Sequence, residues 1–500
     1  MSHSKESNLL PKMSAVIVAV MFCGSLPALA DQKSEKELKK RIEQLENQVQ
    51  QLQNMVTQVV NQTATVAAKT DAVAAKTDAV ELKADAAVAA TADSDDDKQE
   101  FNRIRVKVDS MADNQETSGF KDLKISGMID PTYIVNSARS TAGFNFLGNF
   151  NGTGKDVYAY DNSYFGQARL QFDKELEGGT KFKLTFAPSK SVNLTDIIHE
   201  ASMSVPLTGQ NLKLIAGQIP DWSGYEYYFG DQNKFITHNL LFDFTIPSYY
   251  TGAGLDYTNG NLELKGLIAN MNTTSRLDGD RGAVLAYRGD YSVNEYAGVG
   301  FAGVEGEYAG GEDASAQKWL DMIEFDGYYI RGPLTLDGHV AYGQWKNGAF
   351  NGGDAQWAGF STLLAYKFQP RLEGMIRLDY LQNDKNGGGT IDTTFNSLNA
   401  SGLPVASTDT TAVLGAGDYR NGFGPTAQAA AAYNNDNSIS IKGANRSAIA
   451  LGLNYALQTN IMLKAEYRFD YADLPVFYYQ SGSNYKNFNQ LLGLSTVLSF

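Results

Sequence analysis

The stretch Asn489–Phe500, which reads NQLLGLSTVLSF, alternates large apolar residues with small or polar ones. Successive side chains of a β-strand point to opposite faces, so this stretch predicts a strand with one strongly apolar face. That face would carry Leu492, Leu494, Thr496, Leu498 and Phe500. An exposed strand with such a face invites pairing with other chains, so we expect its surroundings to cover it.

The composition is that of a protein built from strands and turns. The 500 residues include 48 Gly, 27 Tyr and 25 Phe but only 4 Trp. Aromatic residues favour strands, and Gly favours turns. The formal net charge of −14 argues against a nucleic-acid partner, because binding to phosphates requires a basic surface.

Residues 1–30 have the pattern of a secretory signal peptide. Two early lysines precede the apolar segment Met13–Leu26, and Ala28–Ala30 supplies the small residues of a cleavage site. Cys23, the one cysteine of the chain, lies in that apolar segment, so we expect no disulfide in the mature protein.

Residues 31–90 predict an α-helical coiled-coil stalk. From Leu38 onward apolar residues recur at steps of four and three, which is the heptad seam of a left-handed coiled coil. The clearest seam positions are Leu38, Ile42, Leu45, Val49, Leu52, Val56 and Val59. We expect self-association through this seam, although the heptads leave the number of copies open. For the Ala- and Thr-rich second part, a solitary helix or a spacer is the alternative.

Residues 91–119 separate the stalk from the rest of the chain. The acidic run Asp93–Asp97 breaks the heptads, Phe101–Met111 predicts a short helix, and Asn114–Gly119 reads as a linker. After residue 30 no stretch has the roughly 18 consecutive apolar residues that a spanning helix needs. If this chain enters a membrane, it must do so as a closed β-barrel.

Residues 120–500 alternate with a period of two. In the segment 461–470, for example, one face is apolar and the other carries Lys464, Glu466, Arg468 and Asp470. Short turns such as Thr258–Asn261 and Arg331–Pro333 alternate with long Gly- and Asn-rich connections. A soluble β-sandwich alternates in the same way. The charged second face, repeated in strand after strand, favours a transmembrane barrel with water inside.

These segments carry a resemblance to a known family. GMIRLDYLQND at 374–384 and LKAEYRFDYADLP at 463–475 resemble strands of trimeric bacterial outer-membrane porins. The coiled coil followed by LKISGMIDPTYIV at 123–135 is similar to porins with an N-terminal periplasmic stalk, such as the dicarboxylate-uptake porins, and to uncharacterised proteobacterial porin-like proteins. The final strand resembles the signal that the barrel-assembly machinery recognises, with Leu494, Leu498 and Phe500 as its candidate residues.

The resemblance implies a homotrimer of all-β transmembrane barrels in the outer membrane, in contact with its lipid, with the stalk in the periplasm. Each barrel would have about 16 antiparallel strands, with 18 as the alternative, since spanning strands need about 10 residues each plus loops. A barrel of this size leaves an aqueous channel. We therefore predict a porin for passive diffusion of small hydrophilic solutes or ions. The alternative is a structural anchor that ties the membrane to the cell wall.

Charged side chains on the inner face would decide which solutes pass. The basic candidates for the channel lining are Arg169, Lys181, Lys183, Lys213, Lys265, Arg377, Lys464 and Arg468. The acidic candidates are Glu200, Glu263, Glu373, Asp379, Glu466 and Asp470. For any single residue, pairing with a cross-strand neighbour is the plainer interpretation. The aromatic and charged segment Gly217–Phe235 predicts either a loop that folds toward the channel or an aromatic girdle.

Enzymatic interpretations find little support in the sequence. No Gly-rich phosphate loop follows a strand, and no His, Asp and Glu residues have the spacing of metal ligands. We therefore expect no catalytic residues, cofactor or metal. The permeating solute is left open by the sequence.

Overall fold

The structure is a computed structural model that describes residues 103–104, 106–107, 122–138, 140–147, 165–188, 197–209, 211–274, 282–308, 318–391, 395–398, 413–417 and 423–500. The chain divides into two units, Met1–Asn114 and Gln115–Phe500. In the first unit, residues 103–104 and 106–107 are helical. The predicted signal peptide, the coiled-coil seam from Leu38 to Val59 and the linker at 114–119 lie outside the described residues.

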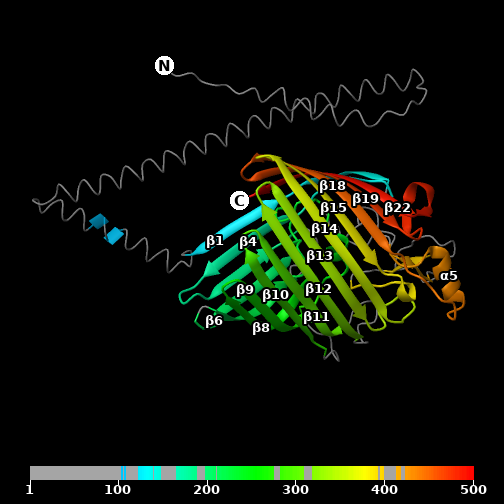
Figure 1. Cartoon of the computed structure of the whole chain (residues 1–500), viewed down its shortest axis with the longest axis horizontal. Helices are drawn as coiled ribbons and strands as arrows, with labels where there is room; N and C mark the ends of the chain where they lie inside the picture. The colour runs from blue at the N-terminus through cyan, green and yellow to red at the C-terminus, as the bar shows by residue number, and fades with distance from the viewer. Residues whose placement is uncertain are drawn as a thin grey trace, which may run out of the picture. The chain divides into compact units, whose positions relative to one another are not determined.

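The segments with period two form strands, as predicted. They are β1 (Leu123–Ile129), β2 (Thr132–Asn136), β3 (Thr141–Asn145), β4 (Ala168–Glu175), β5 (Lys181–Phe186), β6 (Ile198–Thr208), β7 (Leu212–Pro220), β8 (Tyr249–Asn259), β9 (Leu262–Met271), β10 (Val284–Asn294), β11 (Ala297–Tyr308), β12 (Lys318–Arg331), β13 (Leu334–Trp345), β14 (Ala355–Gln369), β15 (Leu372–Gln382), β18 (Arg446–Gln458), β19 (Ile461–Ala472) and β22 (Phe488–Ser499). Together they make one antiparallel sheet. In Figure 1 the middle strands of this sheet follow one another in chain order.

The sheet closes into a barrel of sixteen strand positions. It contains 18 strands, but β2 continues the line of β1 and β3 continues the line of β4. β22 pairs with β19 on one side and with β1 and β2 on the other. The prediction of a closed barrel with about 16 antiparallel strands is therefore confirmed. A count of 18 results only when β2 and β3 are counted as strands separate from β1 and β4.

The ring closes at the final strand. The backbone N–H of Phe500 donates to the carbonyl of Gly127 at 3.0 Å, and the N–H of Gly127 donates to the carbonyl of Phe500 at 3.1 Å. The ring of Phe500 lies against Gly127, where an added Cβ would approach it to 2.7 Å. The exposed apolar edge that the sequence predicted is thus paired, because closure leaves the barrel no free edge.

Connections differ between the two ends of the barrel. At one end the turns are short, as at Gly260–Asn261 and Gly332–Pro333, while the other end carries long segments such as 221–248 and 383–445. The second long segment contains the pair β16 (Phe395–Leu398) and β17 (Val413–Gly417) and the helix α5 (Ala427–Asn435). A smaller pair, β20 (Phe477–Tyr479) with β21 (Asn484–Lys486), lies between β19 and β22.

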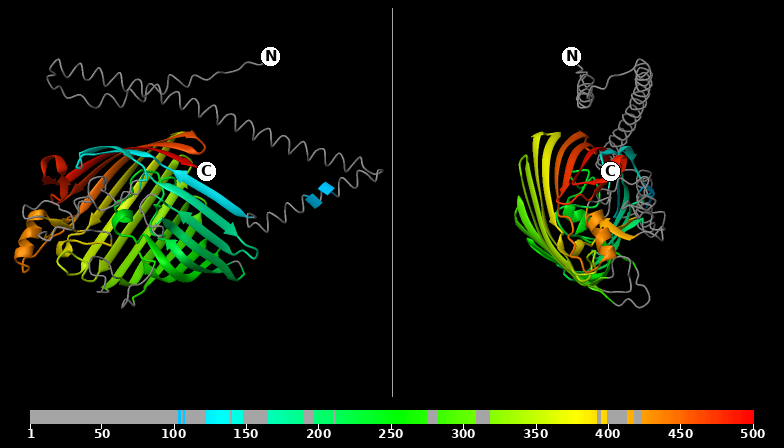
Figure 2. Two further views of the ribbon diagram at one scale, coloured as in Figure 1. Left: turned by 180° about the vertical axis from the view of Figure 1, so that it is seen from behind. Right: turned by 90° about the vertical axis from the view of Figure 1, so that its right-hand side faces the viewer.

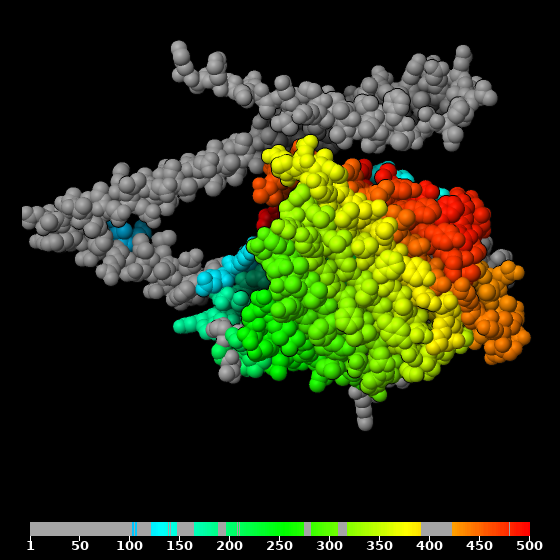
Figure 3. Space-filling model, viewed as in Figure 1, coloured from blue at the N-terminus to red at the C-terminus, as the bar shows by residue number. Residues whose placement is uncertain are grey.

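The outer face of the barrel is apolar and exposed. On β18, for example, Ile449, Leu451 and Leu453 are exposed, whereas Ala450 and Gly452 between them are buried. Figure 3 shows this outer wall as a continuous surface from the green strands to the red ones. An exposed apolar band around a closed barrel is what a lipid environment requires. In the described ranges no helix is long and apolar enough to cross a membrane.

The interior is not uniformly polar, which the sequence pattern did not predict. Toward the end with long connections, the inner faces of β9 to β15 carry buried apolar side chains such as Leu267, Val304 and Trp357. These pack with the short helix α4 (Leu240–Phe244), which belongs to the segment between β7 and β8. Figure 2 shows α4 surrounded by strands in the end-on view. Burial of this apolar surface stabilises the segment inside the barrel.

Candidate functional site: the inner loop and the passage beside it

Residues 221–248, here called the inner loop, cross the inside of the barrel. Their contacts reach wall strands that are far apart on the ring, from Arg169 on β4 through Arg288 on β10 to Arg468 on β19. A segment can touch such distant strands only from within the ring. Of the two predictions for Gly217–Phe235, the structure therefore supports the inward-folding loop for the part that begins at residue 221.

The inner loop begins with features that fix its path. Gly224 has a φ of +69°, and a Cβ at this position would meet the ring of His339 at 2.7 Å. The phenol of Tyr225 shares a hydrogen bond of 2.6 Å with Ser361, whose hydroxyl donates to Asp379 at 2.7 Å. Further along, the side chain of Asn239 accepts hydrogen bonds from the first N–H groups of α4, which is an N-cap.

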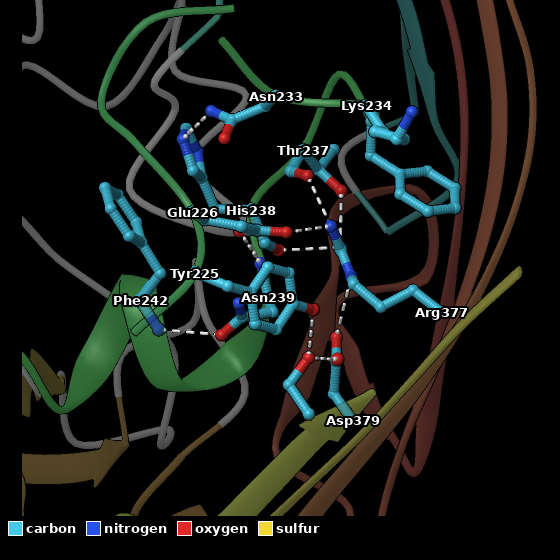
Figure 4. Close-up of polar contacts among 12 residues, drawn as sticks. Tyr225, Glu226, Asn233, Lys234, Thr237, His238, Asn239, Phe242, Arg377 and Asp379 are labelled. Atoms are coloured by element: carbon cyan, nitrogen blue, oxygen red, sulfur yellow. Dashed lines mark hydrogen bonds and ion pairs between the residues drawn. The ribbon is translucent and has the colours of Figure 1, made fainter. Parts of the chain in front are cut away.

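Arg377 on β15 is the centre of the contacts between wall and loop (Figure 4). Its guanidinium donates to the Glu226 carboxylate at 2.9 Å and to the Asp379 carboxylate at 3.2 Å. It also donates to the backbone carbonyls of Thr237 and His238, both at 2.8 Å. The five donors of a guanidinium suit such a cluster of acceptors, and no part of this side chain is exposed.

Three charged residues of β19 hold the next part of the inner loop. The Lys464 ammonium donates to the carbonyls of Gly230 at 2.6 Å and Asn233 at 2.5 Å. Glu466 accepts hydrogen bonds from the N–H groups of Ile236 and Thr237 at 2.7 and 2.9 Å. Arg468 donates to the carbonyl of His238 at 2.8 Å.

These contacts satisfy loop backbone groups that would otherwise be buried without partners.

They also show where half of the candidate channel-lining residues lie. Seven of the fourteen candidates are buried under the inner loop or beside its contacts: Glu373, Arg377, Asp379, Lys464, Glu466, Arg468 and Asp470. Glu373 pairs with Lys234 of the loop at 2.7 Å, and Asp470 pairs with Arg468 and with Arg446. All seven side chains face the inside of the barrel.

Two cavities lie on the opposite side of the interior. A cavity of about 280 Å³ lies between the inner loop and strands β4 to β6, and three of the candidates, Arg169, Lys183 and Glu200, line it. A second cavity of about 480 Å³ shares Lys183 and Glu200 with the first. It extends toward the short-turn end of the barrel, where Lys181 and Lys265 join its lining. We call the two cavities together the passage.

Several charges along the passage are paired. Lys183 lies 3.2 Å from Glu200, and Arg169 makes two hydrogen bonds, at 2.7 and 3.2 Å, with Asp231 of the inner loop. Lys265 pairs with Glu263 at 2.8 Å. Of the remaining candidates, Lys181 pairs with Glu175 at 3.7 Å, and Lys213 lies opposite Asp256 in the register of β7 and β8.

Two carboxyl groups of the inner loop have raised pKa values. Burial raises the pKa of Asp221 to about 6, and the charge of Glu324 adds to this rise. Burial raises the pKa of Glu226 to about 7, although Arg377 favours its ionised form. A buried carboxyl loses the hydration of its charged form, which explains both directions.

The candidates for an assembly signal lie on the outer face of β22. Leu494 and Phe500 are exposed there, and Leu498 is partly buried. In the part of the chain that the structure describes, no group of three or more His, Cys, Asp or Glu side chains could hold a metal ion.

Sequence reasoning missed several residues of this site. Glu226 lies within the quoted segment Gly217–Phe235, but nothing in its spacing indicated Arg377 as its partner, 151 positions away. Arg288, which donates to the carbonyl of Trp222 at 2.8 Å, and Arg446 were missed as well. The only signal for them in the sequence was the alternation of apolar and polar residues along their strands, β10 for Arg288 and β18 for Arg446.

Solved structures with a similar architecture are bacterial outer-membrane proteins. They include an anion-selective porin from Comamonas acidovorans, with 12% identity, a TM-score of 0.48, and coverage of 76% of this chain and 99% of that chain. The outer membrane channel DcaP of Acinetobacter baumannii has 12% identity, a TM-score of 0.40, and coverage of 76% and 97%. OmpT, an outer membrane protein of Vibrio cholerae, has 10% identity, a TM-score of 0.44, and coverage of 76% and 97%.

A comparison with curated protein sequences gives no match. A family model described as "Protein of unknown function (DUF3138)" matches residues 12–280 and 274–500, which is nearly the whole sequence. The chain therefore belongs to the DUF3138 family.

Proposed function

We propose that this protein is an outer-membrane porin, a water-filled channel for passive diffusion of small hydrophilic solutes or ions. The observation that carries the proposal is the position of the inner loop. It packs against the wall on one side of the barrel interior, and the two cavities of the passage lie between it and strands β4 to β6. A loop that narrows a wide barrel without filling it turns the barrel into a selective channel.

The contacts of the loop support this role. A channel needs a constriction of fixed size, and a loop held by buried charges and hydrogen bonds has little freedom to move. Arg377, Lys464, Glu466 and Arg468 give the inner loop such contacts along residues 226–238. The seven candidates buried there would act by positioning the loop, and the candidates at the passage would meet the solute.

Assembly and location complete the proposal. The apolar outer face of the barrel fits the lipid of a bacterial outer membrane. The heptads at 38–59 would join copies of the chain in the periplasm, and the homotrimer that the porin resemblance implies is the assembly we favour. The barrel-assembly machinery and, through the stalk, the cell wall would be its partners.

Recording from planar lipid bilayers tests the proposal. Purified protein in detergent, added to a bilayer in potassium chloride, should give stepwise increases of conductance. Removal of residues 31–114 should leave the size of the steps unchanged, because the passage lies entirely in the second unit. A folded barrel that inserts without conductance steps would reject the porin and favour the structural anchor.

A further inference from the structure

We propose that the passage favours uncharged, hydroxyl-rich ring solutes of about the size of a hexose over ions and over open-chain solutes of the same mass. This inference rests on the proposed channel function and names its substrate class. It follows from three properties of the smaller cavity: an aromatic lining, basic side chains that are already paired, and a mixture of neutral hydrogen-bonding groups.

The aromatic surface belongs mostly to the inner loop. Tyr227, Tyr228 and Phe242 line the smaller cavity, and Tyr227 is 58% exposed. His199 of the wall continues this surface, because its ring lies 4.5 Å from that of Tyr228 and 4.8 Å from that of Phe229. A flat face of C–H groups, such as a sugar ring presents, can pack on aromatic rings, whereas a flexible chain loses conformational freedom when it does so.

The charges of the cavity do not favour either sign. Its lining carries two basic residues, Arg169 and Lys183, and two acidic residues, Glu200 and Asp221. Arg169 is engaged by Asp231, and Lys183 by Glu200, so an entering ion must compete with partners that already lie within 3.2 Å. An ion also loses hydration when it enters so narrow a space. An uncharged solute does not need to displace a charged partner, and each of its hydroxyl groups loses less hydration free energy than an ion does.

Hydroxyl groups find partners in the same cavity. A carboxylate offers about four acceptor positions and an ammonium three donors, so the pair of Lys183 and Glu200 keeps free positions after pairing. Gln171, Thr185 and Gln232 add neutral groups that can donate and accept. The volume of about 280 Å³ lies just below the usual range for sites that bind drug-sized ligands, which suits a single small ring.

Osmotic swelling of proteoliposomes that contain the full-length protein tests the inference. Four probes of closely similar size separate the possibilities: glucose, the open-chain sorbitol, anionic gluconate and cationic glucosamine. We expect glucose to enter fastest. Tyr227→Ser, which removes the most exposed ring of the cavity, should lower the ratio of glucose to sorbitol entry by about twofold to tenfold, the range that corresponds to one aromatic contact.

Tyr291→Ser is the matched control. Tyr291 is 50% exposed on the outer face of β10, away from the passage, and its replacement should leave the ratio unchanged. Equal entry of glucose and sorbitol, or faster entry of either charged probe, would overturn the inference even if potassium chloride steps are present. The absence of those steps would instead reject the channel itself, so the two failures can be told apart.

Discussion

The guanidinium of Arg377 on β15 and the carboxylate of Glu226 in the inner loop lie 2.9 Å apart, and both side chains are buried. They are 151 positions apart in the sequence. Their contact joins the loop to the wall on the side opposite the passage, together with Asp379 and the carbonyl groups of Thr237 and His238. A buried ion pair therefore helps to hold the inner loop against this wall.

Arg377→Met should release the inner loop. The change leaves the carboxylates of Glu226 and Asp379 buried without their cation, and loss of one partner of such a pair costs about 3–5 kcal/mol. We expect a lower midpoint of thermal unfolding in detergent, together with larger and noisier conductance steps in bilayers. Lys442→Met is the control, because Lys442 pairs with Asp473 at an exposed site where an ion pair contributes at most about 1 kcal/mol. Equal unfolding midpoints for the two variants would contradict this role of Arg377.

Gly224→Ala should destabilise the protein by more than the cost of placing alanine in the left-handed backbone conformation of this position. The positive φ costs any L-residue about 1–2 kcal/mol, and the new Cβ would also meet the ring of His339, which Glu324 holds at 2.9 Å. Overpacking of this kind costs about 1–3 kcal/mol more. Gly260→Ala separates the two effects, since Gly260 has a φ of +59° with open space around it. The free energy of unfolding, measured with urea for both variants, should fall further for Gly224→Ala.

The strand pattern predicted the barrel because its period of two is a local property of the sequence. Alternation at 461–470 indicated which side chains of β19 share a face. The apolar edge of the final strand indicated that another strand must cover it, and this is how the barrel closes at Phe500. How deeply each side chain is buried, however, is not a local property of the sequence. Lys464 and Lys183 both lie on the inner face, yet one is covered by carbonyl groups of the inner loop and the other lines the passage.

The inner loop itself could be predicted only in part. The aromatic and charged residues of Gly217–Phe235 were compatible with an inward loop and with a girdle at the membrane surface, because both settings bring rings next to polar groups. Its acceptors for Arg377 and Lys464 include backbone carbonyls, which every sequence has and which therefore give no signal. The apolar side chains of Trp357 and Leu267 on the inner faces share one buried cluster with α4, a contact between distant segments that the local pattern does not indicate.

Lys183 and Glu200 should set the ion preference of the passage in opposite directions. Lys183→Gln leaves Glu200 without its cation and should shift the reversal potential in a potassium chloride gradient toward cation selectivity. Glu200→Gln should shift it toward anions. Lys213→Gln removes the same charge from the inner wall outside the lining of both cavities, so we expect a clearly smaller shift. Similar shifts for Lys183→Gln and Lys213→Gln would mean that ions take another path.

Asp221 should make the ion preference depend on pH. Burial raises its pKa from 3.8 to about 6, so the carboxylate is mostly ionised at pH 7 and becomes neutral as the pH falls through 6. The passage then loses one negative charge, and its ion preference should shift toward anions between pH 7 and 5. Reversal potentials recorded across this range provide the measurement. In Asp221→Asn the change within this window should disappear, and an unchanged pH profile in that variant would show that another group titrates.

Phe500→Ala separates the stability of the barrel from its recognition during assembly. The backbone hydrogen bonds between Phe500 and Gly127 do not need the aromatic ring, and the ring is 69% exposed on the outer face. We therefore expect nearly normal refolding in detergent micelles, where no assembly machinery is present, measured by the shift of the folded barrel on gels. In cells the same variant should reach the outer membrane at a markedly lower level, because the candidate assembly signal has lost its last residue. Phe182→Ala, an exposed outer-face change on β5, controls for the loss of lipid contact and should be inserted normally. Poor refolding of Phe500→Ala in micelles would instead assign the ring a role in closing the barrel.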